Sequence, residues 1–379
     1  MKLSCTQENL NQGLNIVSHI AVKNNNLPIL SNILIKAENK ILTLSATNLE
    51  IGITANIRGK VDNDGQFTVD GKLLTNYIAL LPKERVDLEL ENDELKINCN
   101  KQKTKIKGQN AADYPLIPKI NKIKPYILSA NDFKAAVSEV IFSAATSEIR
   151  PEISGVFMNF IDDNLILAAT DSYRLAEKKL KLIENNKKIE GGERIIIPVK
   201  CLQEVSRILG VFKDDTALDN LENIEIYLID NQIIFTYNGV DLISRLIEGQ
   251  YPDYQQIIPE NFKTKININT NELIKAVKTS SLFTKSGIYD IKVDFNNNKE
   301  LIITSSSSQT GENISTLESN VSGEGGIIIL NYRYLLDGLQ SIDNNEEKII
   351  MEINDSNSPC ILRSEKDNNY LYLIMPIRQ

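Results

Sequence analysis

A short sequence motif, here called the corner phrase, occurs three times along this chain of 379 residues. Residues Leu165–Glu177 read Leu-Ile-Leu-Ala-Ala-Thr-Asp-Ser-Tyr-Arg-Leu-Ala-Glu, where an apolar run stops at a polar corner and then resumes. That pattern is typical of a strand, a tight turn and a second strand. Related phrases occupy Leu42–Ile51 and, in degraded form, Leu301–Thr310. Because the repeats lie about a third of the chain apart, the sequence predicts three similar domains in succession.

Helical periodicity supports the same division. Apolar residues spaced for one helix face recur twice in each third, and Asn131 and Asn271 are suitable N-caps. We expect helices at residues 7–22, 72–82, 131–143, 199–213, 271–285 and 332–342. Extended runs such as Ile29–Ala37 follow each helix, and turn formers such as Asn39 and Asp162 separate them. The expected fold is therefore α+β, with two helix-plus-β-meander units in each domain.

Two similar segments, Ala112–Pro115 and Gly249–Tyr254, place a proline after an aromatic residue and indicate domain junctions. They predict domains at residues 1–124, 125–260 and 261–379. A lone unit leaves the edges of its sheet without partners, so we expect successive sheets to continue one another. Either six units close alone, or two chains close a ring of twelve units through head-to-tail contacts.

Composition and charge limit the class of protein. No uncharged apolar run is long enough to span a bilayer, and Met1–Cys5 does not begin a signal peptide. The four cysteines lie far apart, which predicts buried, reduced thiols, so we expect a cytoplasmic protein without metal or cofactor. The expected helices carry nine basic and six acidic residues, although the whole chain has a net charge of −8. Helices lining a ring would suit a polyanion held through its phosphates, whereas the alternative is that these lysines simply face solvent.

Catalytic motifs are absent from the sequence. It contains no Walker loop, HExxH motif or nucleophile elbow, and the single histidine, His19, has no nucleophile or metal-ligand partner near it in the chain. Thr170 and Asp171 could suggest a carboxylate site, but their recurrence as Thr47 and Asn48 favours a turn-forming role. We therefore expect no enzyme. Two rival classes are an enzyme that uses Asp171 on a small molecule, and a repeat scaffold that binds only proteins.

Four segments together resemble the bacterial DNA polymerase III beta subunit family, the sliding clamps. They are Leu27–Leu30, Ala169–Ala176, Tyr251–Tyr254 and Tyr372–Arg378, and they follow the family's order from the first third to the last. The resemblance implies a head-to-tail homodimer, a ring of six similar domains with helices inside and sheets outside. Such a ring encircles duplex DNA irrespective of sequence and tethers the replicative polymerase, which confers processivity without catalysis.

The resemblance also implies a pocket between the second and third domains that accepts short peptides. The expected partners are the DNA polymerase III alpha subunit, the clamp loader, and other polymerases and repair proteins, with no membrane. The matching positions are Ile153, Thr170, Ser172, Tyr173, Arg174, Leu175, Pro252, Gln256, Ile257, Ile288, Asn331, Tyr334, Leu373, Ile374, Met375, Pro376, Ile377 and Arg378. Most are apolar, and Arg174, Asn331 and Arg378 are expected to fix the peptide backbone.

Several positions depart from the family's pattern. Family members usually carry Gly-His where Ser172 and Tyr173 stand, a basic residue at Gln256 and leucine at Gln379. The bulk of Tyr173 is expected to narrow the pocket. The alternative role for Ile153, Leu175 and Ile374 is that of ordinary core residues.

The resemblance assigns two further surfaces. For DNA the resemblance assigns two loops, with Asn24 replacing the arginine usual in the family, and the charge of the expected helices adds basic residues on four of them. The expected DNA contacts are Lys23, Asn24, Lys72, Lys134, Ser147, Arg150, Lys200, Arg207, Lys275 and Lys278. At the dimer interface, Leu282 and Phe283 are expected to meet a first-domain strand around Thr104 and Ile106, of which Thr104 is less apolar than the family's pattern.

Overall fold

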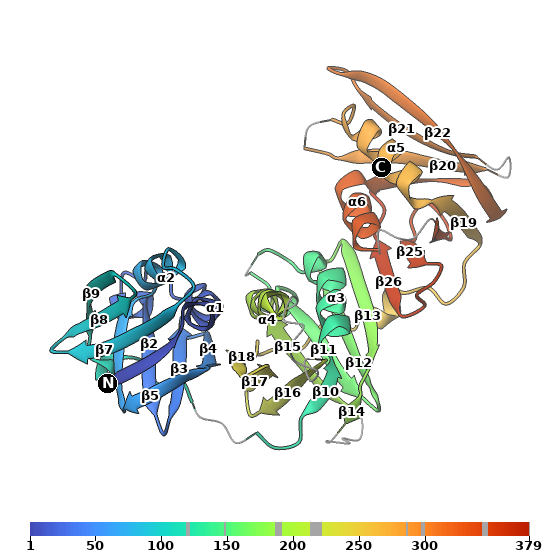
Figure 1. The fold of residues 1–379 in the computed structure, drawn as a ribbon. Coiled ribbons are helices and arrows are strands. Elements are labelled where there is room, and N and C mark those ends of the chain that lie inside the picture. Colours follow the sequence, from blue (N-terminus) through green and yellow to red (C-terminus); the bar gives the residue numbers. More distant parts are fainter. Residues whose placement is uncertain are drawn as a thin grey trace. The chain divides into compact units, whose positions relative to one another are not determined.

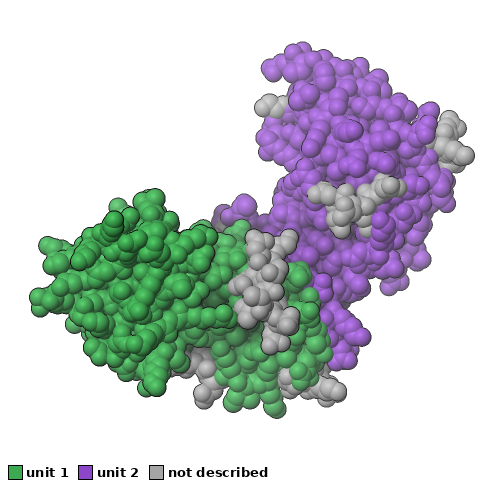
Figure 2. All heavy atoms as spheres, in the orientation of Figure 1, with its two compact units in different colours: residues 1–131, 183–187, 203–246 green, residues 132–182, 188–202, 247–379 purple. Residues whose placement is uncertain are grey.

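The computed structural model describes residues 1–118, 122–147, 149–185, 192–212, 222–285, 287–296, 300–342 and 348–378 (Figure 1). The chain forms two compact units, coloured separately in Figure 2. Unit 1 comprises residues 1–131, 183–187 and 203–246, and unit 2 comprises residues 132–182, 188–202 and 247–379. The boundary between the units therefore falls inside the middle third of the sequence. The domain boundaries expected near residues 124 and 260 stay a prediction.

Unit 1 is organised by one antiparallel sheet. Within the described residues the sheet has 14 strands in the order β14-β10-β16-β17-β18-β4-β3-β2-β6-β9-β8-β7-β1-β5. The strands are β1 Lys2–Thr6, β2 Asn32–Glu38, β3 Ile41–Thr47, β4 Ile51–Ile57, β5 Gly59–Asn63, β6 Gly65–Asp70, β7 Arg85–Glu91, β8 Glu94–Cys99, β9 Gln102–Gln109, β10 Tyr126–Ser129, β14 Glu184–Asn185, β16 Asn223–Ile229, β17 Gln232–Tyr237 and β18 Val240–Arg245.

Two helices lie side by side over the strands of the first third, α1 (Gln7–Ser18) and α2 (Gly71–Ala79) (Figure 1). Helix α1 begins where the Thr6 hydroxyl accepts a hydrogen bond from Asn9 N–H at 3.2 Å. Its residues Leu10, Leu14 and Val17 are buried, as their spacing on one helix face predicts.

Unit 2 repeats this plan with a second antiparallel sheet. Over the part of the chain that is described, it has 12 strands in the order β15-β11-β12-β13-β26-β25-β24-β19-β22-β21-β20-β23. The strands are β11 Gly155–Ile161, β12 Asn164–Thr170, β13 Arg174–Lys181, β15 Glu193–Pro198, β19 Thr264–Asn269, β20 Asp290–Asn296, β21 Glu300–Ser307, β22 Gly311–Gly323, β23 Gly326–Asn331, β24 Lys348–Ile353, β25 Cys360–Ser364 and β26 Tyr370–Ile374. Of the remaining helices, α5 Thr270–Ser281 and α6 Tyr332–Ser341 lie in unit 2, whereas a boundary between the units falls within α3 Ala130–Val140 and within α4 Val199–Val211.

The sheets continue from one third of the sequence into the next, as the edge argument predicts. Strand β4 of the first third pairs with β18 of the middle third, and β13 of the middle third pairs with β26 of the last. Each ladder buries a strand edge that a separate domain would expose. This continuity explains why the two compact units do not coincide with three sequence repeats.

Several expected boundaries are wrong by a few residues. Helix α1 ends at Ser18 rather than residue 22, and α5 ends at Ser281 rather than residue 285. The strand expected from Ile29 begins only at Asn32, because Pro28 starts a short 3₁₀ turn through Ser31. Residue 213, expected at the end of α4, and the expected hairpin turn at residues 297–298 lie outside the described residues.

The corner phrase has a defined geometry in the first third. The Thr47 hydroxyl donates to the Ile51 carbonyl at 2.9 Å and accepts from Leu49 N–H at 3.0 Å. The Asn48 side chain accepts from the N–H groups of Glu50 and Ile51 at 3.1 and 2.8 Å. The same hydrogen bonds recur at residues 170–174, described below. The phrase therefore forms the same turn in the first and middle thirds, as the sequence predicts.

All four cysteines are buried. Burial, with a smaller contribution from Asp87, raises the pKa of the Cys5 thiol to about 12, so this thiol stays protonated at neutral pH. Among the described helices, none has both the length and the apolar character required to cross a membrane.

Candidate partner-binding site

The candidate site is built around the corner between β12 and β13, within unit 2. The Thr170 hydroxyl donates a hydrogen bond to the Arg174 carbonyl at 2.6 Å and accepts one from Ser172 N–H at 3.1 Å. The Asp171 carboxylate accepts from the N–H groups of Tyr173 and Arg174 at 2.9 and 3.0 Å. Both side chains satisfy the backbone of a turn in which Ser172 has a φ of 79°. The predicted turn-forming role of Asp171 is confirmed.

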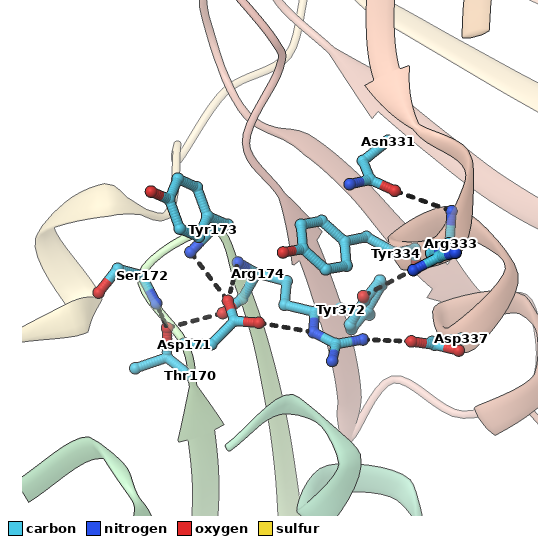
Figure 3. Close-up of polar contacts among 10 residues, drawn as sticks. All are labelled: Thr170, Asp171, Ser172, Tyr173, Arg174, Asn331, Arg333, Tyr334, Asp337 and Tyr372. Atoms are coloured by element: carbon cyan, nitrogen blue, oxygen red, sulfur yellow. Dashed lines mark hydrogen bonds and ion pairs between the residues drawn. The ribbon is translucent and has the colours of Figure 1, made fainter. Parts of the chain in front are cut away.

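Arg174 reaches from β13 to the carboxylates of Asp171 and Asp337 (Figure 3). Its Nε lies 3.0 Å from Asp171 Oδ2, and its Nη1 contacts Asp337 Oδ2 on α6. The guanidinium also lies over the rings of Tyr334 and Phe142, with Cζ 4.7 and 5.5 Å from the ring centroids. Arg174 therefore joins the corner to α6, and its expected role as a donor to a peptide backbone stays a prediction.

Tyr372 of β26 completes this cluster. Burial alone would lower the pKa of Arg174, but its interactions with Tyr372, Asp337 and Asp171 raise it, so the guanidinium keeps its charge. The Tyr372 hydroxyl donates to the Tyr334 carbonyl at 2.8 Å. Its ring packs directly on the backbone of α6, since a Cβ added at Gly338 would lie 2.2 Å from the ring carbons. The glycine thus allows α6 to approach β26 closely.

A buried apolar cluster forms the floor of the site. It contains Ile153, Leu175 and Leu373 together with Ala168, Ile196, Tyr251, Tyr254, Ile361 and Leu371. Met375 is partly buried against it. Ile153, Leu175 and Ile374 are at most 3% exposed, which agrees with the alternative role as core residues. These side chains shape the site from beneath and present little surface of their own.

The C-terminal tail crosses the site after β26 ends at Ile374. The Met375 N–H donates to the Tyr173 carbonyl at 2.8 Å, and the Ile377 N–H donates to the Ile329 carbonyl of β23 at 2.9 Å. The tail is therefore tied by its backbone to the corner at one point and to β23 at the other.

Other predicted residues provide the exposed apolar surface. The exposed fractions of Tyr173, Ile288 and Ile257 are 62%, 47% and 44%. The Gln256 side chain donates to the Asp253 carboxylate at 2.7 Å. Pro252, which directly precedes Asp253 in the sequence, is half-buried. Gln379 lies outside the described residues.

Asn331 is the N-cap of α6, where its side chain accepts from the Arg333 N–H at 2.9 Å (Figure 3). Sequence reasoning missed two side chains that hold Arg174, Asp337 and Phe142. A usable signal exists for Asp337, which follows Tyr334 by three residues and so shares a helix face with it. No local pattern marks Phe142.

The residues expected to contact DNA fall into two groups. Lys72, Lys200, Lys275 and Lys278 are exposed on helices and Lys23 is exposed on a loop, whereas Lys134 is half-buried on a helix. Arg207 instead caps α1 from within unit 1, with Nη1 and Nη2 3.1 and 2.6 Å from the carbonyls of Asn15 and Ile16. Its Nε also lies 2.9 Å from Glu204, which contacts His19 as well.

The two expected DNA-contacting loops have local partners. Asn24 accepts from the N–H groups of Asn26 and Leu27, so its side chain shapes its own loop. Ser147 is exposed, and Arg150 donates to the Ser172 hydroxyl at 3.0 Å. Arg150 thus joins the second loop to the corner of the candidate partner site.

At the expected dimer interface, Leu282 is 71% exposed just beyond α5, and Phe283 is half-buried. Thr104 is half-buried on β9, and Ile106 is only 5% exposed. The Ile106 side chain therefore belongs to the core of unit 1.

Comparison with known proteins agrees with this architecture. Family models of the N-terminal, central and C-terminal domains of the DNA polymerase III beta subunit match residues 1–118, 127–253 and 255–378. The beta sliding clamp of Staphylococcus epidermidis is 31% identical over 366 residues, covering 93% of this chain and 92% of the relative. That of Synechocystis is 28% identical over 401 residues, covering 100% of this chain and 99% of the relative. The crystal structure of the Bacillus subtilis DNA polymerase sliding clamp has a TM-score of 0.91 at 26% identity, covering 100% of this chain and 99% of that chain.

These matches and the repeated domains define a non-catalytic polymerase subunit of the sliding-clamp class. The chain belongs to the DNA polymerase III beta subunit family, the beta sliding clamps.

Proposed function

We propose that this chain forms, in the bacterial cytoplasm, a closed ring that encircles duplex DNA and tethers the replicative DNA polymerase. The observation that carries the proposal is the match of all three beta-subunit domains, in order, to nearly the whole chain. Once the duplex is inside, it leaves only when the ring opens. Weak phosphate contacts therefore suffice to retain the ring and still permit sliding. A loader must supply the energy for opening, since the sequence has no nucleotide-binding motif.

Retention on DNA tests this proposal. After loading, we expect the protein to stay on a circular duplex and to leave when one cut linearises that duplex. Retention that is the same on circular and linear DNA would contradict encirclement. The absence of any retention would favour the rival class, a scaffold that binds only proteins.

Two strand edges support closure of the ring by a second copy. Residues 102–107 of β9 pair with β8 on one side and have no ladder partner among the described residues on the other. Residues 311–318 of β22 likewise pair only with β21, because β19 pairs with Ser319–Gly323 alone. The first edge carries the exposed Lys103, Lys105 and Lys107, and the second carries the exposed Glu312 and Glu318. Pairing of β9 with β22 of another copy would join edges of opposite charge.

Replacing Leu282 with aspartate is expected to weaken the dimer by about 2 kcal/mol, roughly thirtyfold in Kd. The reason is that a dimer would bury this exposed apolar side chain, and a carboxylate there would lose its water. Sedimentation at micromolar concentration measures the change, with twice the monomer mass of 42.6 kDa expected for the unchanged protein. Ile149→Asp is the matched control, since Ile149 is 90% exposed and lies outside the expected interface. A monomeric unchanged protein would contradict the closed ring.

Helix lysines are proposed to face the DNA. Replacing Lys275 and Lys278 of α5 with glutamine is expected to lower the salt dependence of binding to a short linear duplex by about 2 in log–log slope. The strand residue Lys265, which is 58% exposed and lies 2.7 Å from Glu352, provides the control Lys265→Gln. Fluorescence anisotropy at a series of salt concentrations gives the slope. A change of about 1 in slope for this single-charge control would place the DNA on the sheets instead.

The candidate partner site is proposed to bind short peptides of the polymerase alpha subunit, the clamp loader, and other polymerases and repair proteins. Its exposed apolar surface lies at Tyr173, Ile257 and Ile288, beside a floor that is already packed. Arg174 acts as a positioning residue, because it fixes the corner to α6. Since each chain has one such site, polymerase and loader are expected to compete for it.

A further inference from the structure

Arg333 and Tyr289 form a cation–π pair at the start of α6. The Arg333 Cζ lies 3.6 Å from the centroid of the Tyr289 ring. The Tyr332 ring packs edge-on against Tyr289, with centroids 5.9 Å apart and an interplanar angle of 80°. The Arg333 side chain itself is exposed. A guanidinium held on an aromatic face is already oriented, so it loses less freedom when it then binds an anion.

The backbone under this pair is fixed in an uncommon conformation. Tyr289 has a φ of 61°, in the left-handed region that bulky residues rarely adopt. The Tyr332 N–H donates to the Tyr289 carbonyl at 2.9 Å, and Asp290 of β20 pairs with Asn331 of β23. These contacts hold the Tyr289 ring beneath Arg333. Strained backbone of this kind is often found where a binding site requires a particular side-chain position.

Arg333 differs from two other arginines near the site in its charged neighbours among the described residues. Arg174 has the carboxylates of Asp171 and Asp337, and Arg150 has that of Glu152 at 3.2 Å. Within the described residues, no carboxylate lies at ion-pair distance from Arg333.

Arg333 adjoins the candidate partner site in the sequence and in space. It lies between the site residues Asn331 and Tyr334, and Figure 3 shows it beside both. The Arg333 guanidinium stacks on the ring of Tyr289, and Tyr289 directly follows the exposed site residue Ile288. A peptide whose apolar side chains lie at Ile288 and Tyr173 would therefore bring its neighbouring residues to Arg333.

We propose that Arg333, stacked on Tyr289, binds a carboxylate side chain that flanks the apolar anchors of a partner peptide. This inference rests on the proposed partner site and adds an acidic element to what that site recognises. The apolar anchors supply contact area, and the acidic residue supplies a charge-assisted hydrogen bond to the oriented guanidinium. Peptides with the same anchors and a neutral flank bind the same surface more weakly.

A peptide selection on the full-length protein tests this proposal. Displayed random dodecapeptides are selected on the unchanged protein, on Arg333→Ala, and on Lys60→Gln, which changes the net charge by the same amount in unit 1. We expect the unchanged protein and Lys60→Gln to enrich apolar anchors together with a flanking Asp or Glu. Arg333→Ala is expected to enrich the same anchors without the acid. Acidic enrichment that persists on Arg333→Ala, or is absent on the unchanged protein, overturns the proposal.

Anisotropy on one selected peptide and its Glu→Gln partner gives the magnitude. We expect the acidic peptide to bind the unchanged protein about 3- to 5-fold more tightly at low salt, with the ratio near one at about 0.5 M salt. Arg333→Ala is expected to bring the affinity ratio to one by weakening the binding of the acidic peptide alone. Tyr289→Leu is expected to lower the ratio. A ratio unchanged in Arg333→Ala overturns the assignment. If no selected peptide loses affinity when residues 375–379 are removed, the proposed partner site itself fails, whatever the ratio.

Discussion

Removal of residues 375–379 is expected to reduce polymerase stimulation to the level measured without this protein, while the dimer stays intact. The tail supplies two backbone hydrogen bonds, from Met375 to Tyr173 and from Ile377 to Ile329. It also supplies the Met375 side chain on the apolar floor. Strand β26 keeps its ladder with β13, because that ladder ends at Ile374. The fold should therefore survive the deletion and the partner site should not.

Primer extension on a circular template, with loader and polymerase present, measures the stimulation, and sedimentation measures the dimer. The double variant Met375→Ala with Ile377→Ala is the matched control, since it keeps the chain length and both backbone hydrogen bonds. We expect this control to retain the dimer and lose part of the stimulation. Dissociation of the truncated protein into monomers would show that the tail belongs to the subunit interface instead.

Replacement of Lys178 by methionine is expected to lower the free energy of unfolding by about 3 kcal/mol. The Lys178 side chain is 11% exposed, and its Nζ lies 2.6 Å from Glu139 Oε2 and also contacts Asp367 Oδ2. The variant would leave these two carboxylates facing each other without a cation. Because Asp367 is 35% exposed, the expected loss of stability lies toward the lower end of the range for breaking a buried ion pair. Chemical denaturation followed by circular dichroism measures the change.

The neighbouring Lys179→Met is the matched control, because its side chain is 51% exposed and lies 3.6 Å from Glu177. We expect it to change stability by less than about 0.5 kcal/mol. Adding Glu139→Gln and Asp367→Asn to Lys178→Met should recover part of the lost stability. Equal losses in Lys178→Met and Lys179→Met would contradict the assigned role of the buried cluster.

The sign of the pH dependence follows from the same cluster. Burial alone would lower the pKa of Lys178, but hydrogen bonds to Asp367 and Glu139 raise it above the ordinary value of 10.5. Its contribution to stability is therefore fully present below pH 10.5 and is lost only as the pH rises through the raised value. The difference between Lys178→Met and the unchanged protein should thus be the same at neutral and mildly alkaline pH.

Local chemistry explains which parts of the fold are predictable from the sequence. Thr170 and Asp171 form their turn with residues no more than four positions away, so the repeated phrase is sufficient to identify it. The buried faces of α1 and α6 follow from periodicity. The sequence does not predict the 3₁₀ turn at Pro28. A short apolar run after a helix has the pattern of a strand whether its backbone is extended or forms a turn.

The candidate site is predictable in position but not in its internal contacts. The corner and tail segments identify where it lies, yet Arg174 and Asp337 are 163 positions apart in the sequence. Whether this arginine binds a partner or holds two elements of its own chain depends on how β13 and α6 pack. Sequence pattern does not specify that packing, and the same holds for Arg207, whose guanidinium binds carbonyls of α1.

The place of β26 in its sheet affects how the protein is made. This strand lies between β13 and β25, and it follows every other strand of that sheet in the order of the chain. During translation, both neighbouring strands emerge from the ribosome with their hydrogen-bonding edges open, and nothing earlier in the chain takes that position. The nascent protein must keep these edges from pairing with other chains until β26 has been synthesised. A product that lacks β26 would never close that gap, so quality control should recognise such incomplete chains readily.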